Sequence, residues 1–198
     1  MHARIAVAVA EALGGDESGF AELMNKKAYA LGMVRTHFHN ASGLPDAKQT
    51  TTARDLALLG RHIAYDFPQY YPYFAVEAFS YRGRYYGTHN NLLGVFEGTD
   101  GIKTGYTHSS GFNLVTSVVR GNAHLIGVVM GSRTAAARDQ QMKQLLAIQF
   151  TRIEANNTQV MPANVPWQTA NAGPKTNPFK GAVAQSLAEG GYQMAMTA

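Results

Sequence analysis

Apolar and polar residues recur at helical spacing in the first third of the chain and at strand spacing further on. A short apolar run from Ile5 to Ala10 ends at Leu13-Gly14-Gly15, which predicts a buried, alanine-rich helix. Asp16 and Gly32 then bracket a second helical pattern as start and end signals. The apolar positions of that pattern are Phe20, Leu23, Met24, Ala28 and Leu31. Two helices are therefore expected before any strand.

A third helix is predicted to begin after Thr52, which forms a variant of the capping box with Asp55. The apolar stripe of this helix consists of Leu56, Leu59 and Ile63. The helix is expected to end near Asp66-Phe67-Pro68. Residues 33–51, ahead of it, are rich in turn-forming residues and are expected to form a loop.

Strand patterns dominate the middle of the chain. The segment from Phe79 to Tyr86 is dense in aromatic residues and is expected to form a hairpin around Arg82-Gly83. Two β-rich apolar runs, Phe112 to Val119 and Ala123 to Met130, are separated by the turn Arg120-Gly121-Asn122. This spacing predicts a second antiparallel hairpin.

A last helix is predicted after Thr134, whose hydroxyl can cap it, and one face of this helix should close the core. That face comprises Met142, Leu145, Leu146 and Gln149. From about Asn156 onward the periodicity fails, and Pro and Gly residues punctuate the sequence. We therefore expect one domain over residues 1–153 and a linker or disordered tail over residues 154–198.

Composition narrows the class of protein. With 198 residues, of which 45% are apolar and 15% charged, the chain can bury one globular core. The formal charge of +4 comes without any dense Lys/Arg cluster, which favours mild attraction to anionic surfaces over nucleic-acid binding. The absence of cysteine excludes disulfides, thiolate metal sites and a cysteine nucleophile. No cofactor is expected.

Two groups of residues allow more than one interpretation. His37 and His39 alternate as in a strand and could be metal ligands, but no third ligand is near in sequence, so an ordinary surface or core histidine is favoured. The tyrosines between Tyr70 and Tyr86, together with nearby arginines, could stack on nucleic-acid bases. Because charge is sparse, aromatic packing beside a cleft is the favoured interpretation.

The segment from Asp100 to Thr107 carries the most suggestive chemistry. The tripeptide Lys103-Thr104-Gly105 heads a strand pattern, where a Lys ammonium and a Thr hydroxyl can both reach a bound anion. The Gly would let a substrate backbone lie close to the strand. Such a tripeptide alone is weak evidence, since it should occur by chance in roughly one chain of this length in twenty. An ordinary strand with an extended surface lysine remains an alternative.

Several blocks of sequence, in the same order, carry a resemblance to a known family. They are Phe20 to Asn25, Leu31-Gly32-Met33, Thr36-His37-Phe38, Gly43-Leu44, Thr52 to Ala57, Asp100 to Thr107, Gly111 to Leu114 and Met130 to Thr134. Over residues 3–153 the chain resembles the serine-type D-alanyl-D-alanine carboxypeptidases of peptidase family S11, which are low-molecular-weight penicillin-binding proteins. The resemblance implies an α/β fold of α+β type, with an antiparallel sheet flanked by helices.

The resemblance also implies roles for individual residues. In the family, a serine in a Ser-x-x-Lys motif attacks the carbonyl between the two terminal D-alanines of a peptidoglycan stem peptide, and water later releases the acyl group. Lys103 would belong to the catalytic centre, and Lys103, Thr104, Gly105 and Thr107 would bind the substrate. Arg138 matches the arginine that anchors the terminal carboxylate. The alternative for Arg138 is a solvated residue in the first helical turn, where the helix dipole disfavours a cation.

The chain also departs from the family pattern. None of its eight serines is followed by Lys at the third position or by Asn at the second, so the Ser-x-x-Lys and Ser-x-Asn motifs are absent. We therefore expect the second half of a catalytic domain, incomplete at the N-terminus and inactive alone. An exposed sheet edge and an apolar helix face should follow, with self-association as a consequence.

Other function classes remain open at this stage. One is a non-catalytic module that binds D-Ala-ended peptides, and another is a structural remnant with a protein interface in its Tyr-rich segment. The expected partners are stem peptides ending in D-Ala-D-Ala and, for the intact family member, β-lactams; nucleic acid is not expected. The family implies a location outside the cytoplasmic membrane, although Met1 to Ala12 does not make a convincing signal peptide.

Overall fold

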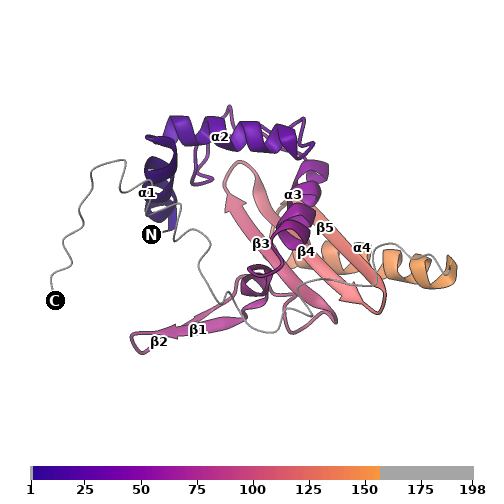
Figure 1. Cartoon of the computed structure of the whole chain (residues 1–198). Helices are drawn as coiled ribbons and strands as arrows, with labels where there is room; N and C mark the ends of the chain where they lie inside the picture. Colours follow the sequence, from indigo (N-terminus) through magenta and orange to yellow (C-terminus); the bar gives the residue numbers. More distant parts are fainter. Residues whose placement is uncertain (1, 157–198) are drawn as a thin grey trace.

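The computed structural model describes residues 2–156, which form a three-stranded antiparallel sheet with helices on both faces (Figure 1). The elements in chain order are α1 (His2–Gly14), α2 (Glu17–Ala30), α3 (Ala53–Asp66), a 3-10 helix η1 (Tyr71–Ala75), β1 (Ala78–Tyr81), β2 (Arg84–Gly87), β3 (Thr99–Thr107), β4 (Gly111–Arg120), β5 (Ala123–Ser132) and α4 (Ala135–Asn156). The expected α/β class with a helix-flanked antiparallel sheet is confirmed.

The sheet has the strand order β3-β4-β5. Lys103 pairs with Val115 and Gly105 with Asn113 across β3 and β4. Arg120 pairs with Ala123 at the turn between β4 and β5, so the predicted hairpin is confirmed. Within the described residues, β3 and β5 each have one edge without a neighbouring strand, which leaves the sheet open on both sides.

Local start and stop signals were predicted correctly because they depend on neighbouring residues. The side chain of Asp16 accepts the Gly19 N–H at 2.7 Å at the start of α2. Gly32 has φ 80°, and the Met33 N–H bonds the Ala28 carbonyl at 2.9 Å, so α2 ends in a Schellman turn. Thr134 caps α4 through the Ala137 N–H at 3.0 Å.

Each face of the sheet has its own core. Under α4 the buried residues are Leu92, Leu114, Val118, Ala123, Val129, Met142, Leu146 and Phe150. Under α3 and η1 they are Ala64, Tyr71 and Ile102, with Ile63, Phe74, Val115 and Val119 packed against them. The sheet is therefore the central layer of a three-layer arrangement.

The predicted inner face of the last helix was partly wrong. Met142 and Leu146 are buried as expected, but Leu145 is exposed and Phe150 takes the place given to Gln149. The buried residues recur every four positions, because α4 lies along the sheet on that single narrow stripe. Arg138 lies one turn before Met142 on the same stripe and is also buried.

The first helix forms, but its predicted burial was wrong. Ala10 is buried, whereas Ile5, Val9 and Leu13 are exposed. The contacts of α1 are made chiefly with α2, so the opposite apolar side has no element packed on it within the described residues. The expected open apolar helix face is therefore present.

The hairpin of β1 and β2 forms around Arg82-Gly83, as predicted, with φ values of 48° and 73° at the two turn residues. Its expected packing beside a cleft was wrong. Tyr81 and Tyr85 are 57% and 76% exposed, because this two-stranded ribbon projects away from the body (Figure 1). Only Tyr71, which lies before the ribbon, is fully buried among the tyrosines of this region.

The last helix extends past the expected end of the domain. Helix α4 continues to Asn156, three residues into the tail predicted for residues 154–198, and the rest of that predicted tail, residues 157–198, lies outside the described part. None of the helices within residues 2–156 combines the length and the hydropathy that crossing a bilayer requires.

His39 Nδ1 lies 2.8 Å from Asp46 Oδ2, so this histidine has a carboxylate partner.

Candidate active site

Lys103, Thr104 and Gly105 lie on the free edge of the sheet. Strand β3 pairs with β4 on one side, while no strand pairs with its other side in the described residues. The Lys103 side chain is exposed, and its ammonium donates to the Thr104 carbonyl at 2.6 Å. A free edge with an adjacent cation is suited to bind an extended peptide that carries a negative charge.

Gly105 leaves the surface of β3 open, although the fold does not require glycine at this position. A Cβ at this position would meet no atom within 4 Å, and φ at Gly105 is not in the left-handed region. Neither packing nor backbone conformation therefore requires glycine here. The reason for glycine at this position is access, because glycine lets another backbone approach the strand closely.

The start of β3 is held in place by two side chains. Asn90 Nδ2 and Thr116 Oγ1 both donate to the Gly101 carbonyl, at 3.0 and 2.8 Å. Helix α3 approaches the sheet at Gly60, where a Cβ would lie 3.0 Å from the Ile102 side chain. The strand is therefore fixed immediately before Lys103.

Two cavities meet at this strand. One, of about 360 Å³, lies between α3 and the sheet and is lined mostly by apolar side chains, such as Leu59, Ile63 and Val128. The other, of about 520 Å³, follows β3 to Thr107 and continues to the loop at residues 42–51. Lys103, Thr104 and Gly105 line both. The larger cavity is lined by every β3 residue from Lys103 to Thr107.

A polar turn shapes the far end of the larger cavity. Thr107 Oγ1 lies 2.6 Å from Ser110 Oγ and accepts the Ser110 N–H at 2.9 Å. Asn113 Nδ2 donates to Ser110 Oγ at 2.9 Å, and its Oδ1 accepts the Gly131 N–H at 3.0 Å. Thr107, expected as a substrate-binding residue, is thus beside the cavity but already bonded within this turn. Asn113 lies in the Gly111 to Leu114 block but was not predicted as a functional residue, because the sequence does not show that this strand position borders the cavity.

The opposite wall of the larger cavity is held by Asp55. Its carboxylate accepts hydrogen bonds from Thr36 Oγ1 at 2.7 Å and from the Arg35 N–H at 2.9 Å, and its own N–H bonds Thr52 Oγ1 at 3.1 Å. The Thr36 hydrogen bond, above all, holds the pKa of Asp55 below its usual range. The predicted cap thus also ties the start of α3 to the loop.

Arg138 does not line either of the two cavities. Arg138 is 3% exposed, and its guanidinium donates from Nε and Nη2 to Asp139 Oδ1, at 2.8 and 2.6 Å. Its Nη1 lies 3.5 Å from the Asn113 carbonyl, opposite Gly105 on the sheet. The alternative of a solvated arginine was therefore wrong, while the role in binding a carboxylate remains a prediction.

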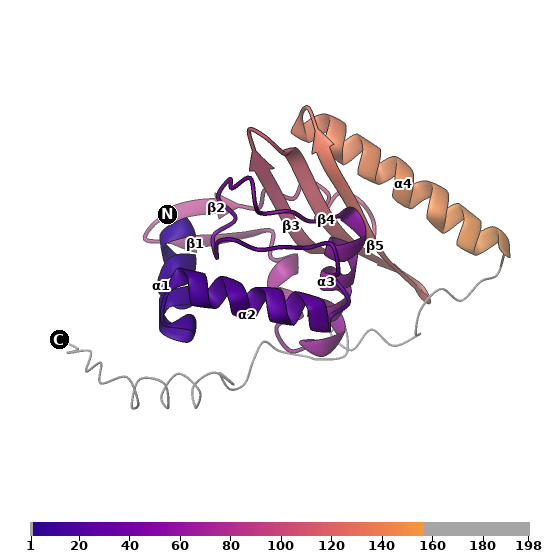
Figure 2. The ribbon, with the colours of Figure 1, turned by 90° about the horizontal axis from the view of Figure 1, so that it is seen from above.

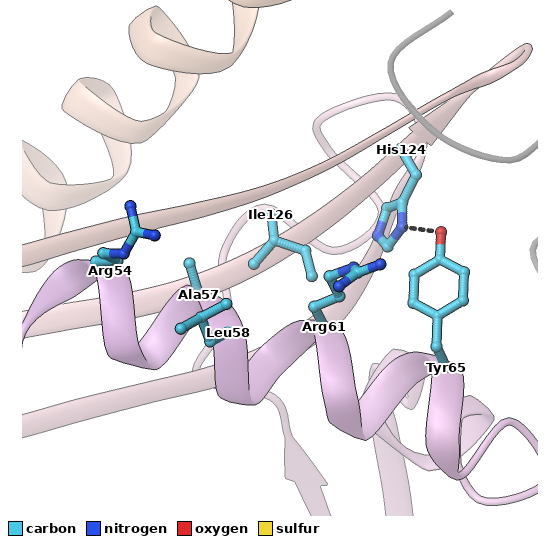
Figure 3. Close-up of a pocket in the computed structure, with 7 residues that line it drawn as sticks. All are labelled: Arg54, Ala57, Leu58, Arg61, Tyr65, His124 and Ile126. Atoms are coloured by element: carbon cyan, nitrogen blue, oxygen red, sulfur yellow. Dashed lines mark hydrogen bonds between the residues drawn. The ribbon is translucent and has the colours of Figure 1, made fainter. Parts of the chain in front are cut away.

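A third cavity, of about 310 Å³, lies between α3 and β5 (Figure 3). His124 lines it and is bonded on both ring nitrogens, to Tyr65 OH at 2.9 Å and to Ser117 Oγ at 2.8 Å. Burial lowers the pKa of His124, and burial likewise raises the pKa of the nearby Tyr71. This network joins α3 to β4 and β5, and the cavity beside it does not include Lys103.

Comparison with known proteins decides the family. The model of the D-alanyl-D-alanine carboxypeptidase family matches residues 2–134. The chain belongs to this family. It is 38% identical over 152 residues to D-alanyl-D-alanine carboxypeptidase DacA of Escherichia coli K12, an alignment that covers 76% of the chain and 38% of that relative. The chain thus spans well under half the length of this curated relative.

Solved structures agree with the family assignment. Penicillin binding protein 5 from Haemophilus influenzae superposes with a TM-score of 0.69 at 37% identity, covering 73% of the chain and 43% of that protein. Penicillin-binding protein D2 from Listeria monocytogenes, solved in a cefotaxime-bound form, superposes with a TM-score of 0.67 at 30% identity. That match covers 73% of the chain and 60% of the Listeria protein. The carboxypeptidase fold is therefore shared over most of the described residues.

Proposed function

We propose that this chain supplies the substrate-binding strand of a D-alanyl-D-alanine carboxypeptidase. The reaction is removal of the terminal D-Ala from a peptidoglycan stem peptide. The observation that carries the proposal is the free edge of β3, where Lys103 and the unobstructed Gly105 border a cavity of about 520 Å³. Because the stem peptide lies outside the cytoplasmic membrane, the protein would act there.

The strand can bind such a peptide in two ways at once. The peptide backbone would add a strand to the free edge of β3, since main-chain hydrogen bonds are available there. The Lys103 ammonium and the Thr104 hydroxyl would bind the terminal carboxylate through charge-assisted hydrogen bonds. In this arrangement Thr107 would orient the leaving D-Ala. Arg138, which lies beside the Asn113 carbonyl, would help to anchor the terminal carboxylate.

The nucleophile would come from a Ser-x-x-Lys serine that is absent from the 198 residues. Its hydroxyl would attack the penultimate carbonyl, the terminal D-Ala would leave with a proton on its nitrogen, and water would hydrolyse the acyl-serine ester. These residues by themselves would therefore bind the substrate without turning it over.

Peptide titration tests the binding part of the proposal. Calorimetry would compare a short acylated peptide ending in D-Ala-D-Ala with the same peptide ending in L-Ala-L-Ala. Thr104→Val and Lys103→Met should each weaken binding of the first by roughly tenfold, because each removes one carboxylate hydrogen bond. Lys26→Met, which removes an exposed lysine on α2, is the control. Equal affinity for the two peptides would contradict the proposal.

Labelling with a fluorescent penicillin tests the catalytic part. Mass spectrometry should find no covalent adduct on the 198-residue chain. A fusion with the segment of Escherichia coli DacA that precedes the matched region should gain an adduct on the serine of that segment. An adduct on any serine of the unfused chain would overturn the assignment of the nucleophile. A folded fusion that binds the peptide but forms no adduct would favour a non-catalytic binding module.

A further inference from the structure

The ribbon formed by β1 and β2 carries aromatic and basic side chains that no other described element covers. Phe79, Tyr81 and Tyr85 are all more than half exposed. Arg82 and Arg84 lie at and beside the turn, and Ala78 to Gly87 contains no acidic residue. Aromatic rings with a net positive charge, presented on a projecting element, are typical of a binding surface.

Most of these side chains share one face of the ribbon. Phe79 lies opposite Tyr86, and Tyr81 lies opposite Arg84, while Tyr85 lies opposite Ser80. Since directly paired residues point the same way and neighbours alternate, Tyr85 is on the other face. The aromatic face is defined here as Phe79, Tyr81, Arg84 and Tyr86.

Ring contacts hold the aromatic face in order. The Phe79 and Tyr86 rings stack, with centroids 5.1 Å apart and planes 13° apart. The Arg84 guanidinium carbon lies 5.7 Å from the centroid of Tyr86, and that of Arg82 lies 5.3 Å from the centroid of Tyr81. These contacts order the rings and place hydrogen-bond donors of both arginines beside them.

The base of the ribbon is tied to the substrate strand. The Thr88 N–H donates to the Glu77 carbonyl at 2.7 Å, which closes the base, and the Asn90 N–H donates to Thr88 Oγ1 at 3.1 Å. Asn90 in turn bonds the Gly101 carbonyl of β3. Figures 1 and 2 both show the ribbon projecting on the side of the sheet where β3 has its free edge.

We propose that the aromatic face binds a carbohydrate chain of N-acetylated hexosamines, the glycan strand from which the stem peptide branches. The inference rests on the proposed function, because a peptide lying along β3 brings its glycan strand to the same side of the molecule. The C–H faces of pyranose rings carry slight positive charge and stack on the negative faces of aromatic rings. The guanidiniums donate to acetamido and hydroxyl oxygens of the sugar.

Other partners fit the ribbon less well. Two arginines without a surrounding basic cluster neutralise too few phosphates for a nucleic-acid site. The phenol groups of Tyr81 and Tyr86 add donors and acceptors that a hydroxyl-rich ligand satisfies. The ribbon therefore favours a carbohydrate.

Titration with a hexamer of N-acetylglucosamine, which has no peptide, tests the inference on the full chain. A Phe79→Ala/Tyr81→Ala double variant should bind the hexamer about tenfold more weakly, because two ring contacts are lost. The matched control is Tyr85→Ala, which removes a more exposed ring from the other face and should leave affinity unchanged. Unfolding curves would establish that both variants keep the wild-type stability.

Several outcomes would overturn the inference. They are failure of the wild-type chain to bind the hexamer, equal weakening by Tyr85→Ala and the double variant, and binding of a single-stranded oligonucleotide or an anionic phospholipid vesicle in place of the sugar. Gly105→Ala separates this inference from the proposed function, since it should weaken binding of the D-Ala-D-Ala peptide and leave hexamer binding intact. Loss of one binding activity without the other therefore shows which of the two proposals fails.

Discussion

At the scale of single residues, local sequence predicted what depends on neighbours and missed what depends on packing. The caps at Asp16 and Thr134 were found because each bonds an N–H three residues later. The burial of Arg138 against Asp139 was not found, since Asn91, which bonds Asp139, comes from a distant part of the chain. The bonding of His124 was not found either, since Tyr65 is also distant in sequence.

His124 should make folding stability depend on pH. Burial lowers its pKa below the usual 6.5, an effect to which Arg61 adds and which Asp100 opposes. Below pH 6.5 His124 becomes protonated in the unfolded chain while it stays neutral in the folded chain. The free energy of unfolding should therefore fall as the pH drops from about 6.5 towards the folded pKa. Chemical denaturation between pH 7.5 and 5 measures this slope. His124→Gln should flatten it, and an unchanged slope in the variant would contradict the assignment.

Arg138 should contribute to the free energy of unfolding, apart from any role in binding. Arg138→Ala leaves the Asp139 carboxylate buried without its guanidinium, at a cost of roughly 3 kcal/mol in the free energy of unfolding. Arg133→Ala removes a nearby exposed arginine and should change little. An Arg138→Met/Asp139→Leu double variant should recover stability, and titrating it with the D-Ala-D-Ala peptide separates the two roles. Retained peptide binding in the double variant would contradict the predicted contact with the substrate carboxylate.

At the scale of elements, hydrophobic spacing predicted the helices and the β4–β5 hairpin, but not which sides of them are covered. The pattern of α1 resembled a buried helix although only one of its sides meets α2. The pattern of α4 suggested a wider inner face than the single stripe that meets the sheet. Which side of a helix or strand is buried depends on the elements that pack against it. The spacing of apolar residues within that helix or strand does not reveal those neighbours.

Gly60 and Gly105 should respond differently to the same substitution. A Cβ at Gly60 would lie 3.0 to 3.3 Å from the side chains of Ile102, Val115 and Ile126, so Gly60→Ala should push α3 from the sheet and destabilise the fold by about 1–3 kcal/mol. Gly105→Ala meets nothing within 4 Å and should change stability by less than about 0.5 kcal/mol. Thermal unfolding of both variants, with peptide titration of the second, checks the contrast. Full peptide affinity in Gly105→Ala would contradict the role given to this glycine.

At the scale of the whole molecule, the sheet is open at both outer strands within residues 2–156, and α1 exposes apolar side chains next to α2. The family resemblance predicted an exposed sheet edge and an apolar helix face, and both are present in the described residues. The candidate site was predicted in the same way, through Lys103, Thr104 and Gly105. Its cavity walls could not be predicted, since α3, the 42–51 loop and β3 meet only in the fold.

The open surfaces should cause self-association. Sedimentation velocity at rising concentration is expected to show species larger than the monomer, because unpaired strand edges and apolar helix faces are buried by a second copy. Replacing Ile5 and Leu13 by Lys should shift the distribution towards the monomer if α1 contributes, whereas Glu22→Lys on the exposed side of α2 is the control. A single sharp monomer boundary at all concentrations, with a cooperative thermal transition, would count against this prediction.

Gly105 also has a consequence for mutational tolerance. Folding places no demand on this position, so a library of all side chains at residue 105, selected only for stable expression, should return most of them. The same library selected for retention on an immobilised D-Ala-D-Ala peptide should return glycine almost alone. The difference between the two sets of residues would measure how strongly ligand access, and not folding, selects for the missing side chain at Gly105.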